Sequence, residues 1–530
     1  MNPSLQASLD EIFAPYARSD APGAIVGVAH RGRTLVRTAY GLANVEHGVA
    51  NSPGTRFPIA SVTKHFTCAA VLRLAQAGRI DLDAAVGRWL PELALPQQGV
   101  TPRQLMSHTA GLRCYLDVTM PLNGWAVRPA GLPRQVQARQ SAFNFEPGHG
   151  MSYCNGGYLL LSLIVERASG QPFEQHLHEQ FFAPLRMDAT VVQRRQVPVP
   201  RGVADAYLPC EGGWQRGAPF SEDFTGDGAM VSSVDDLLRW AAWLRSAEGA
   251  PLLAAMGSRT RLVNGHETDY GLGLIHEVWR GQRLLQHGGS LRGAQCQFLM
   301  LPDPELDVAV LCNRMADTRS LALRVVEAVL GEAALAPVVP APASADHAPL
   351  LGHWFEPETG ALYTFADVDG RLALGAFGLP PAPLEGLAGD GVLPFVHRLI
   401  GRSTHFRLDA TAAGGELEVI EAGFARRAVR VGGVVPAGAH VAAEASGPYA
   451  NADAGGTLRL AMDGEQLVLH GHGEYGAAHW PAQPLGPDLV RAWGPGSAVG
   501  LLLRLERDSS GRVDALHLSS LRTRSLRFTA

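Results

Sequence analysis

Two stretches in the C-terminal third of the chain repeat one another, and this repeat constrains the fold more than any other feature. GHWFEPETGALYTFADVDGRLAL (352–374) matches GPYANADAGGTLRLAMDGEQLVL (447–469), at an offset of about 95 residues. FRLDATAAGGELEVI (406–420) matches LRLERDSSGRVDALHL (503–518) at a similar offset. The first pair places Asp-Gly between alternating strands, which is a strong hairpin sequence. Because closure of such strands removes exposed edges, the repeat predicts two related antiparallel β-barrels, at about 347–432 and 440–530.

The residues before the repeat, 1–335, mix helices and strands. AIVGVAHRGRTLVRTAYG (24–41) and GAQCQFLMLPDPELDVAVLCN (293–313) each predict two antiparallel strands, while helical patterns lie between them and at both ends of the region. Strands at both ends of a region with helices between them indicate an antiparallel sheet covered by its terminal helices, which is an α+β domain. A proline- and alanine-rich linker, predicted at 336–346, joins this domain to the barrels.

Composition excludes several classes of protein. The net charge of −5 and the pI near 6.4 give no basic field for nucleic acid. No run approaches the ~20 apolar residues of a membrane span, and the first residues lack the basic and apolar regions of a secretory signal. The six cysteines show no CxxC pairing, so we expect them to be reduced. These features predict a cytoplasmic protein without nucleic-acid or membrane partners, either a monomer or a homodimer.

Lys64 is the only lysine among the 45 lysine and arginine residues of the chain. On a surface the two side chains are largely interchangeable, but arginine stays charged at any usable pH, whereas a buried lysine can lose its proton. A single lysine in an arginine-rich chain therefore suggests a site that needs a removable proton. The alternative is a surface lysine left over in an arginine-biased composition.

The neighbourhood of Lys64 favours the first interpretation. Pro58 precedes an apolar helix predicted from about Ser61 to Ala77. Ser61 lies three residues before Lys64, so both side chains project from one face of this helix. A serine beside a desolvated lysine at a helix N-terminus is an arrangement for an activated nucleophile.

Two further stretches contain candidate site residues. FEPGHGMSYCNGGYLLLS (145–162) places Tyr153 and Asn155 in a turn before a helix, where a phenol and an amide could face a cleft. QHGGSLRGAQCQF (286–298) places His287-Gly288-Gly289 at the start of a strand, where small residues let a substrate backbone lie alongside. Taken separately, each is also compatible with an ordinary turn.

Together and in this order, these elements resemble the penicillin-recognising serine hydrolases, which include class C β-lactamases, DD-peptidases, esterases and D-amino-acid peptidases. The resemblance extends over roughly residues 10–335 and includes RFPIASVTKHFT, GRIDLDAAVGRWLPEL, TPRQLMSHTAGL and FEPGHGMSYCNGGYLLL. The layout of a catalytic domain followed by two barrels, which the resemblance makes lipocalin-like, is most similar to the D-aminopeptidase branch of this superfamily.

The resemblance implies a role for each site residue. Ser61 would be the nucleophile, and Lys64 would receive or relay its proton. Tyr153 would share this work and protonate the leaving amine, and Asn155 would orient Lys64 and the substrate amide. The backbone N–H groups of Ser61 and Ser290 would form the oxyanion hole. Neither a metal nor a cofactor is implied.

One departure from the family bears on the substrate. His287-Gly288-Gly289 stands where β-lactamases of this group typically have Lys-Thr-Gly, which helps to hold a substrate carboxylate. We therefore expect weak carboxylate recognition, with His287 among the catalytic residues. In the D-aminopeptidase branch a loop of the last barrel reaches into the cleft, and HGHGEYGAAHW (470–480) is the matching loop here. Glu474, its only acid, is the candidate for binding the substrate amine.

The sequence thus predicts a serine aminopeptidase that removes N-terminal D-amino acids from short peptides, amino-acid amides or esters through an acyl-enzyme. The first alternative is an esterase, DD-peptidase or class C-like β-lactamase on the same catalytic domain. The second is a sensor that becomes acylated without turnover. The preferred D-residue and the choice between Lys64 and Tyr153 as general base are left open.

Overall fold

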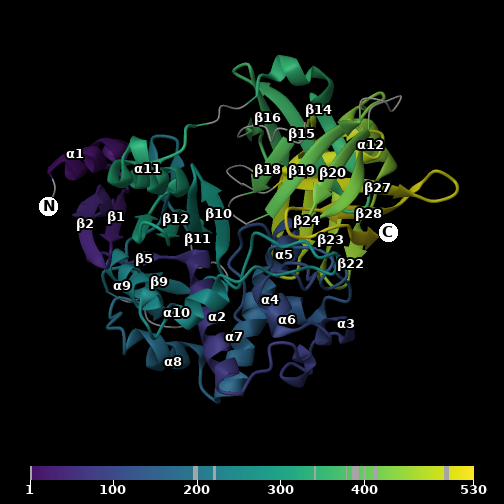
Figure 1. Ribbon diagram of the computed structural model, residues 1–530. Helices are drawn as coiled ribbons and strands as arrows, with labels where there is room; N and C mark the ends of the chain where they lie inside the picture. Colours follow the sequence, from purple (N-terminus) through teal and green to yellow (C-terminus); the bar gives the residue numbers. More distant parts are fainter. Residues whose placement is uncertain are drawn as a thin grey trace.

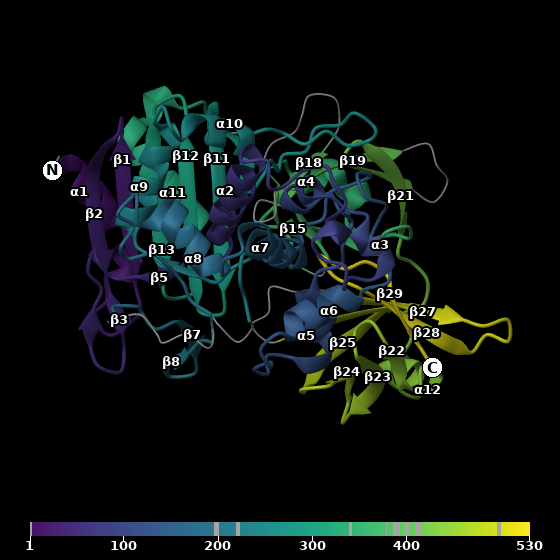
Figure 2. The same cartoon turned by 90° about the horizontal axis from the view of Figure 1, so that it is seen from below.

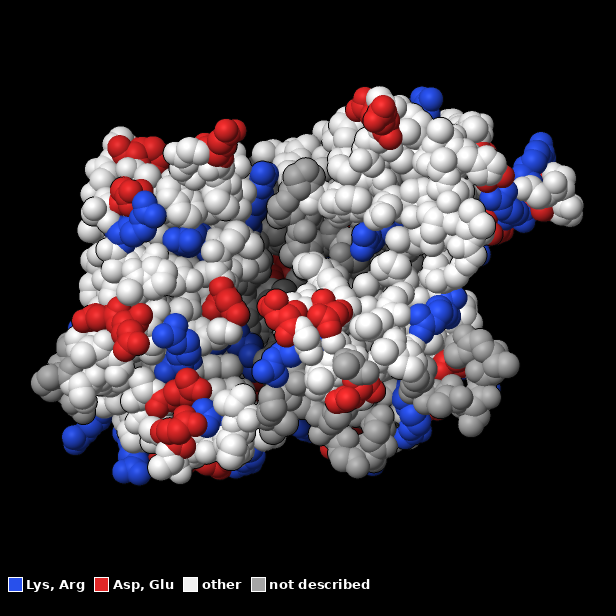
Figure 3. Space-filling view, turned by 90° about the horizontal axis from the view of Figure 1, so that it is seen from above, with Lys and Arg blue, Asp and Glu red and all other residues white. Residues whose placement is uncertain are grey.

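The computed structural model shows a mixed α/β part on one side and two β-sheet parts on the other (Figure 1). It describes residues 3–194, 201–218, 223–338, 342–377, 379–384, 393–397, 402–409, 416–494 and 500–530. No helix within these ranges is both long and apolar enough to cross a bilayer. Acidic and basic side chains are interspersed on the face seen from above, where no extended basic patch is visible (Figure 3).

The α/β part is built on a six-stranded antiparallel sheet in the order β10-β11-β12-β13-β1-β2. Its strands are β1 (Ala24–His30), β2 (Arg33–Tyr40), β10 (Ile275–Trp279), β11 (Gln282–Leu291), β12 (Ala294–Leu301) and β13 (Leu306–Cys312). The helices α1 (Pro3–Ile12) and α11 (Thr318–Leu330) pack their apolar residues on one face, with the sheet residues Val26, Val308 and Val310. The predicted α+β arrangement, including the hairpin over residues 24–41, is confirmed.

The other face of the sheet is covered by a larger helical layer (Figures 1 and 2). Its longest helices are α2 (Thr63–Gln76), α7 (Asn155–Ser169) and α9 (Val234–Arg245). The shorter helices are α3 (Leu95–Gln98), α4 (Pro102–Met106), α5 (Tyr115–Asn123), α6 (Leu132–Arg139), α8 (Phe173–Leu177) and α10 (Ala250–Met256). Short strands at its margin are β3 (Leu42–Asn44), β4 (Val49–Ala50), β5 (Phe57–Pro58), β6 (Val191–Val192), β7 (Tyr207–Cys210), β8 (Gly213–Arg216) and β9 (Met230–Ser232). Because α2 is surrounded by this apolar layer, most of its residues are buried, including Lys64.

The last part is a closed antiparallel barrel, as the sequence predicts. Its strands are β22 (Tyr449–Asn451), β23 (Gly456–Asp463), β24 (Gln466–Gly473), β25 (Ala477–Gly486), β26 (Leu489–Trp493), β27 (Gly500–Arg507), β28 (Val513–Ser519) and β29 (Leu526–Thr529). The helix α12 (Gly438–Glu444) precedes the first of these strands. Leu458, Leu503 and Phe528 are among the apolar side chains of its core.

The middle part is an eight-stranded antiparallel sheet in the order β17-β16-β15-β14-β21-β20-β19-β18. Its strands are β14 (Gly352–Glu356), β15 (Ala361–Val368), β16 (Arg371–Ala376), β17 (Ala382–Pro383), β18 (Leu393–His397), β19 (Arg402–Asp409), β20 (Glu416–Glu421) and β21 (Phe424–Arg430). Within the described residues the edge strands β17 and β18 do not pair with each other, so this sheet is open where the sequence predicts a barrel. Since β17 is short and Pro383 has no N–H to donate, β17 is a poor closing strand.

The last barrel packs directly on α5 of the catalytic domain (Figure 2). Trp480 on β25 donates its indole N–H to the carbonyl of Pro121 at 3.0 Å. A Cβ atom added to Gly471 on β24 would lie 2.0 Å from the same carbonyl oxygen. The two elements therefore approach as closely as their backbones allow.

This close approach predicts the effect of Gly471→Ala. The added methyl group must push the barrel away from α5, and overpacking of this kind costs about 1–3 kcal/mol. Gly432→Ala is the matched control, because a Cβ there meets nothing within 4 Å. Thermal unfolding should show a lower midpoint for Gly471→Ala alone. Equal midpoints for the two variants would contradict the contact.

Candidate active site

Ser61 sits in a tight turn directly before α2. The sequence predicts one helix from Ser61, but the structure has a short 3₁₀ turn, Ala60–Val62, before the α-helix begins at Thr63. The cause is Ala60, whose φ of +46° lies in the left-handed region that side chains other than glycine rarely adopt. Ser61 is part-exposed, whereas almost all of its neighbours are buried. Strained backbone of this kind is common at functional sites.

Lys64 connects three separate segments of the chain. Its amine donates to Ser61 Oγ at 3.2 Å, to Asn155 Oδ1 at 2.8 Å and to the carbonyl oxygen of Asp227 at 2.6 Å. Asn155 is the first residue of α7, so the turn before that helix does face Ser61. The three contacts fix the amine and account for all three hydrogens of its charged form.

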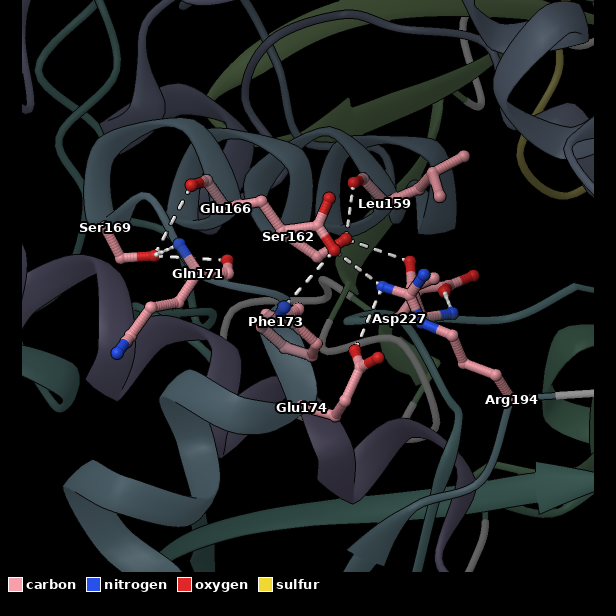
Figure 4. Close-up of polar contacts among 10 residues, drawn as sticks. Leu159, Ser162, Glu166, Ser169, Gln171, Phe173, Glu174, Arg194 and Asp227 are labelled. Atoms are coloured by element: carbon pink, nitrogen blue, oxygen red, sulfur yellow. Dashed lines mark hydrogen bonds and ion pairs between the residues drawn. The ribbon is translucent and has the colours of Figure 1, made fainter. Parts of the chain in front are cut away.

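The carbonyl of Asp227 is held in place by its own side chain. One carboxylate oxygen accepts a bond from Tyr115 Oη at 2.8 Å, and the other accepts from the backbone N–H of Thr225 at 2.9 Å. Thr225 Oγ1 in turn lies 2.9 Å from Ser162 Oγ on α7. Figure 4 shows Asp227 and Ser162 side by side against α7. Two helices, α5 and α7, therefore position the carbonyl that receives the Lys64 amine.

Burial dominates the electrostatics of Lys64. The side chain is fully buried, and removal from water lowers its pKa from an ordinary value near 10.5 to about 7, although the negative charge of Asp227 opposes this shift. At neutral pH a large share of the molecules thus carries an uncharged amine 3.2 Å from Ser61 Oγ. Such an amine can accept the hydroxyl proton, which a guanidinium cannot.

Tyr153 forms the adjacent wall of the site. Lys64 Nζ lies 4.9 Å from the centroid of its ring. Burial raises the pKa of the phenol, an effect that the nearby Ser61 hydroxyl partly offsets. The hydroxyl has no partner in hydrogen-bonding geometry among the described residues. A neutral, buried phenol next to the nucleophile is suited to donating a proton to a leaving group.

The strand β11 forms the opposite wall. β10 pairs only with its first half, up to Gln286, so the second half presents a free edge to the turn that carries Ser61. A Cβ atom added to Gly289 would lie 2.4 Å from the carbonyl oxygen of Ile59, which shows how tightly this edge meets the turn. Ser290 follows Gly289 on the same edge and is part-exposed. The predicted Gly288, Gly289 and Ser290 are thus brought beside Ser61.

His287 is fully buried behind this edge. Its Nδ1 lies 2.6 Å from the carbonyl oxygen of Gly288, which can only accept, so Nδ1 carries the proton and Nε2 accepts from Tyr270 Oη at 3.0 Å. Burial holds the pKa of this imidazole well below its usual range. His287 is therefore a neutral group that braces Tyr270 and the Tyr153 ring, whose centroid lies 6.1 Å away.

Glu474 lies apart from the residues described so far. It is exposed, and its carboxylate accepts from the hydroxyl of Tyr475 at 2.7 Å. The hairpin that carries it touches the end of α5, where Asn123 Oδ1 accepts from the backbone N–H of Tyr475 at 3.2 Å. The barrel segment that packs beside Tyr153 is instead the β28–β29 connection, through Leu521. A role in the cleft for loop 470–480 and a substrate-binding role for Glu474 both stay predictions.

Three supporting residues are missing from the sequence-based prediction. Tyr115 and Tyr270 occur in no recognisable pattern, whereas Asp227 lies in Gly226-Asp227-Gly228, a polar turn that the sequence could have marked.

All six cysteines are free thiols. Within the described ranges, no three His, Cys, Asp or Glu side chains come together as a metal site.

Known proteins are similar to this chain in sequence and in fold. A protein-family model described as Beta-lactamase matches residues 9–330. The D-aminopeptidase of Brucella melitensis biotype 2 is 31% identical over 392 residues, which is 72% of each chain. The D-aminopeptidase of Gluconobacter oxydans is 30% identical over 396 residues, or 73% of each chain.

Two solved structures share the fold. The octameric penicillin-binding protein homologue from Pyrococcus abyssi has a TM-score of 0.56 at 22% identity and covers 81% of this chain and 100% of its own. The D-amino acid amidase from Ochrobactrum anthropi SV3 has a TM-score of 0.52 at 23% identity and covers 62% of this chain and 98% of its own. At these identities the likeness concerns the fold alone.

The tight contact between β11 and the Ser61 turn predicts the effect of Gly289→Ala. The added methyl group would meet the Ile59 carbonyl and Cys296 Sγ, so the strand must shift away from Ser61. We expect the rate of Ser61 modification by phenylmethylsulfonyl fluoride to fall at least about 100-fold, the usual effect of losing an oxyanion-hole donor. Gly228→Ala is the matched control, since its Cβ would lie 3.9 Å from Ala60 in ordinary contact. A Gly289→Ala variant with unchanged reactivity would contradict the assignment.

Proposed function

The chain belongs to the β-lactamase family and is a serine hydrolase, and we propose that it releases N-terminal D-amino acids from short peptides, amides or esters. The observation that carries the proposed mechanism is the buried Lys64 amine bonded to Ser61 Oγ. The proposed substrate class is supported by relatives named D-aminopeptidase that match 72% of the chain.

The first step is acylation of Ser61. The neutral Lys64 amine takes the hydroxyl proton as Ser61 Oγ attacks the substrate carbonyl carbon. The carbonyl oxygen gains negative charge in the transition state, and the backbone N–H groups of Ser61 and Ser290 donate to it, an interaction worth about 3–4 kcal/mol when one donor is lost. The free edge of β11 lets the substrate backbone lie alongside while this happens.

The second step releases the amine and then the acid. Tyr153 donates its hydroxyl proton to the departing nitrogen and recovers a proton from Lys64, so the pair returns to its starting charge. Water then attacks the acyl-enzyme with the same groups acting in reverse. Because Lys64 and Tyr153 share these protons, the pair titrates as a unit and the general base is best described as the pair.

The wall around His287 disfavours a substrate that is held by a free carboxylate. A neutral imidazole engaged by Tyr270 and Gly288 offers no positive charge to a carboxylate. Its neighbours Gly288 and Gly289 offer no hydroxyl. Substrates of DD-peptidases and β-lactamases carry a carboxylate at this end, so these two activities are the weaker candidates.

A panel of four substrates tests the proposed activity. We expect D-Ala-p-nitroanilide to be hydrolysed at least about 100-fold faster than its L-enantiomer, and nitrocefin to be a poor substrate. Turnover of a short-chain p-nitrophenyl ester or nitrocefin alone would point instead to an esterase or a β-lactamase. Mass spectrometry of a stable Ser61 adduct without turnover would indicate an acylated sensor.

Lys64→Arg tests the proton transfer within that activity. Arginine keeps the charge and approximate bulk but cannot release a proton, so kcat should fall about 10³-fold. In the unaltered enzyme kcat/KM depends on the uncharged amine, and it should fall about tenfold per pH unit below a midpoint near the Lys64 pKa of about 7. A Lys64→Arg variant that kept most of its rate would contradict the mechanism. Circular dichroism of the variant provides the control for folding.

A further inference from the structure

The connection between β28 and β29, residues 520–525, leaves the last barrel and enters the catalytic domain. Its main anchor is Asp117 on α5, which is fully buried. One carboxylate oxygen accepts from Ser520 Oγ at 2.6 Å and from the backbone N–H of Arg522 at 2.9 Å, while the other accepts from Arg522 Nε at 2.8 Å. The terminal Nη2 of Arg522 also forms an ion pair with this carboxylate. Four groups of the connection therefore contact Asp117.

The same connection spans from α5 to the Tyr153 wall. The carbonyl oxygen of Arg522 accepts from the backbone N–H of Cys114 at 3.4 Å and from Asn144 Nδ2 at 3.1 Å. Leu521 packs against the apolar cluster that contains Tyr153 and Tyr270. The guanidinium of Arg522 is thus bound to Asp117 on α5, and its side chain is only 16% exposed.

α5 links this anchor to the reacting groups. Asp117 binds Arg522, and Tyr115, two residues earlier, binds the side chain of Asp227, whose carbonyl receives the Lys64 amine. Coulomb interactions are strong where water is excluded. The positive charge of Arg522 disfavours a second positive charge on Lys64, and the negative charge of its partner Asp117 opposes this effect.

We propose that Arg522, supplied by the last barrel, is a positioning residue of the active site whose charge keeps the Lys64 amine ready to take the Ser61 proton. This inference rests on the role of Lys64 in the proposed function. It gives the barrel a part in the reaction. The charge acts through Lys64 and does not require contact with the substrate.

The electrostatic environment of Lys64 and Tyr153 supports this assignment. The positive charge of Arg522 lowers the pKa of Lys64, in addition to the larger effect of burial. It also lowers the pKa of the Tyr153 phenol, against the opposing effect of burial. The other titratable or charged side chains that interact electrostatically with Lys64 or lie against it are Cys68, His108, Cys114, Tyr153, Cys154, Tyr158, Asp227 and His287.

The test measures how fast phenylmethylsulfonyl fluoride modifies Ser61 between pH 5 and 9. In this reaction Ser61 Oγ bonds to sulfur, fluoride leaves, and the hydroxyl proton passes to Lys64, so the rate follows the uncharged amine. For Arg522→Gln the midpoint should rise by about 0.5–1 pH unit, which is a loss of about three- to tenfold at pH 6 with little change at pH 9. Arg522→Lys keeps the charge and should restore the midpoint.

Arg524→Gln is the matched control, because Arg524 lies in the same connection and forms a buried ion pair with Glu421 of the middle sheet at 2.9 Å. It should lower the thermal unfolding midpoint and leave the pH midpoint in place. Asp117→Asn removes the counter-charge of Arg522 and should move the pH midpoint downward, a direction that loss of stability alone does not produce. If Arg522→Gln fails to fold, Asp117→Asn still tests the effect of the Arg522 charge on Lys64.

An unchanged midpoint in Arg522→Gln, or an equal shift in Arg524→Gln, would overturn the inference, as would an upward shift in Asp117→Asn. The measurement also separates this inference from the substrate assignment, because the sulfonyl fluoride is not a D-amino-acid derivative. If the predicted shifts occur but D-amides are not hydrolysed, the role of Arg522 stands and the D-aminopeptidase proposal falls. If Ser61 is not modified at all in the unaltered enzyme, both fall.

Discussion

The structure depends on one buried amine. Lys64 holds together the turn that carries Ser61, the start of α7 at Asn155 and the loop that contains Asp227. Burial destabilises the charged form of this amine. It therefore favours the uncharged form, which can accept the Ser61 proton in the reaction. The surrounding helices give this amine acceptors for its hydrogens, and among the described residues no carboxylate forms an ion pair with it. An arginine would fill the same space without giving up a proton, which explains why the one lysine of the chain occurs here.

The barrels are part of this arrangement. The last barrel packs on α5 through Trp480 and Gly471, and its β28–β29 connection binds Asp117 on the same helix. Tyr115 on that helix holds Asp227, so α5 transmits the position of the barrel to the carbonyl that receives Lys64. These contacts argue against a catalytic domain whose active site is complete without the barrels.

The sequence predicted those features that depend on local pattern. Alternating residues gave β1 and β2, and the repeat of about 95 residues is matched by β15 and β23, which begin at Ala361 and Gly456. The spacing of Ser61 and Lys64 follows from one helical turn, so the pair was found, and the family resemblance identified Tyr153 and Asn155. The contacts of Asp227, Tyr270 and Arg522 join segments far apart in the chain, and no local pattern encodes them. The prediction of a cleft-facing loop at 470–480 came from the family resemblance, because sequence alone does not show which hairpin of a barrel meets its neighbour.

The most direct test of the account is the titration of Lys64 itself. Because it is the only lysine in the sequence, lysine labelled with ¹³C at Cε gives a single side-chain signal in the NMR spectrum of the intact protein. The account predicts that the chemical shift of this signal titrates with a midpoint near 7, and that the midpoint persists in Ser61→Ala, which removes the nucleophile and leaves the buried amine. A midpoint near 10.5, the ordinary value for an exposed lysine, would contradict the claim that Ser61 is activated by an uncharged amine.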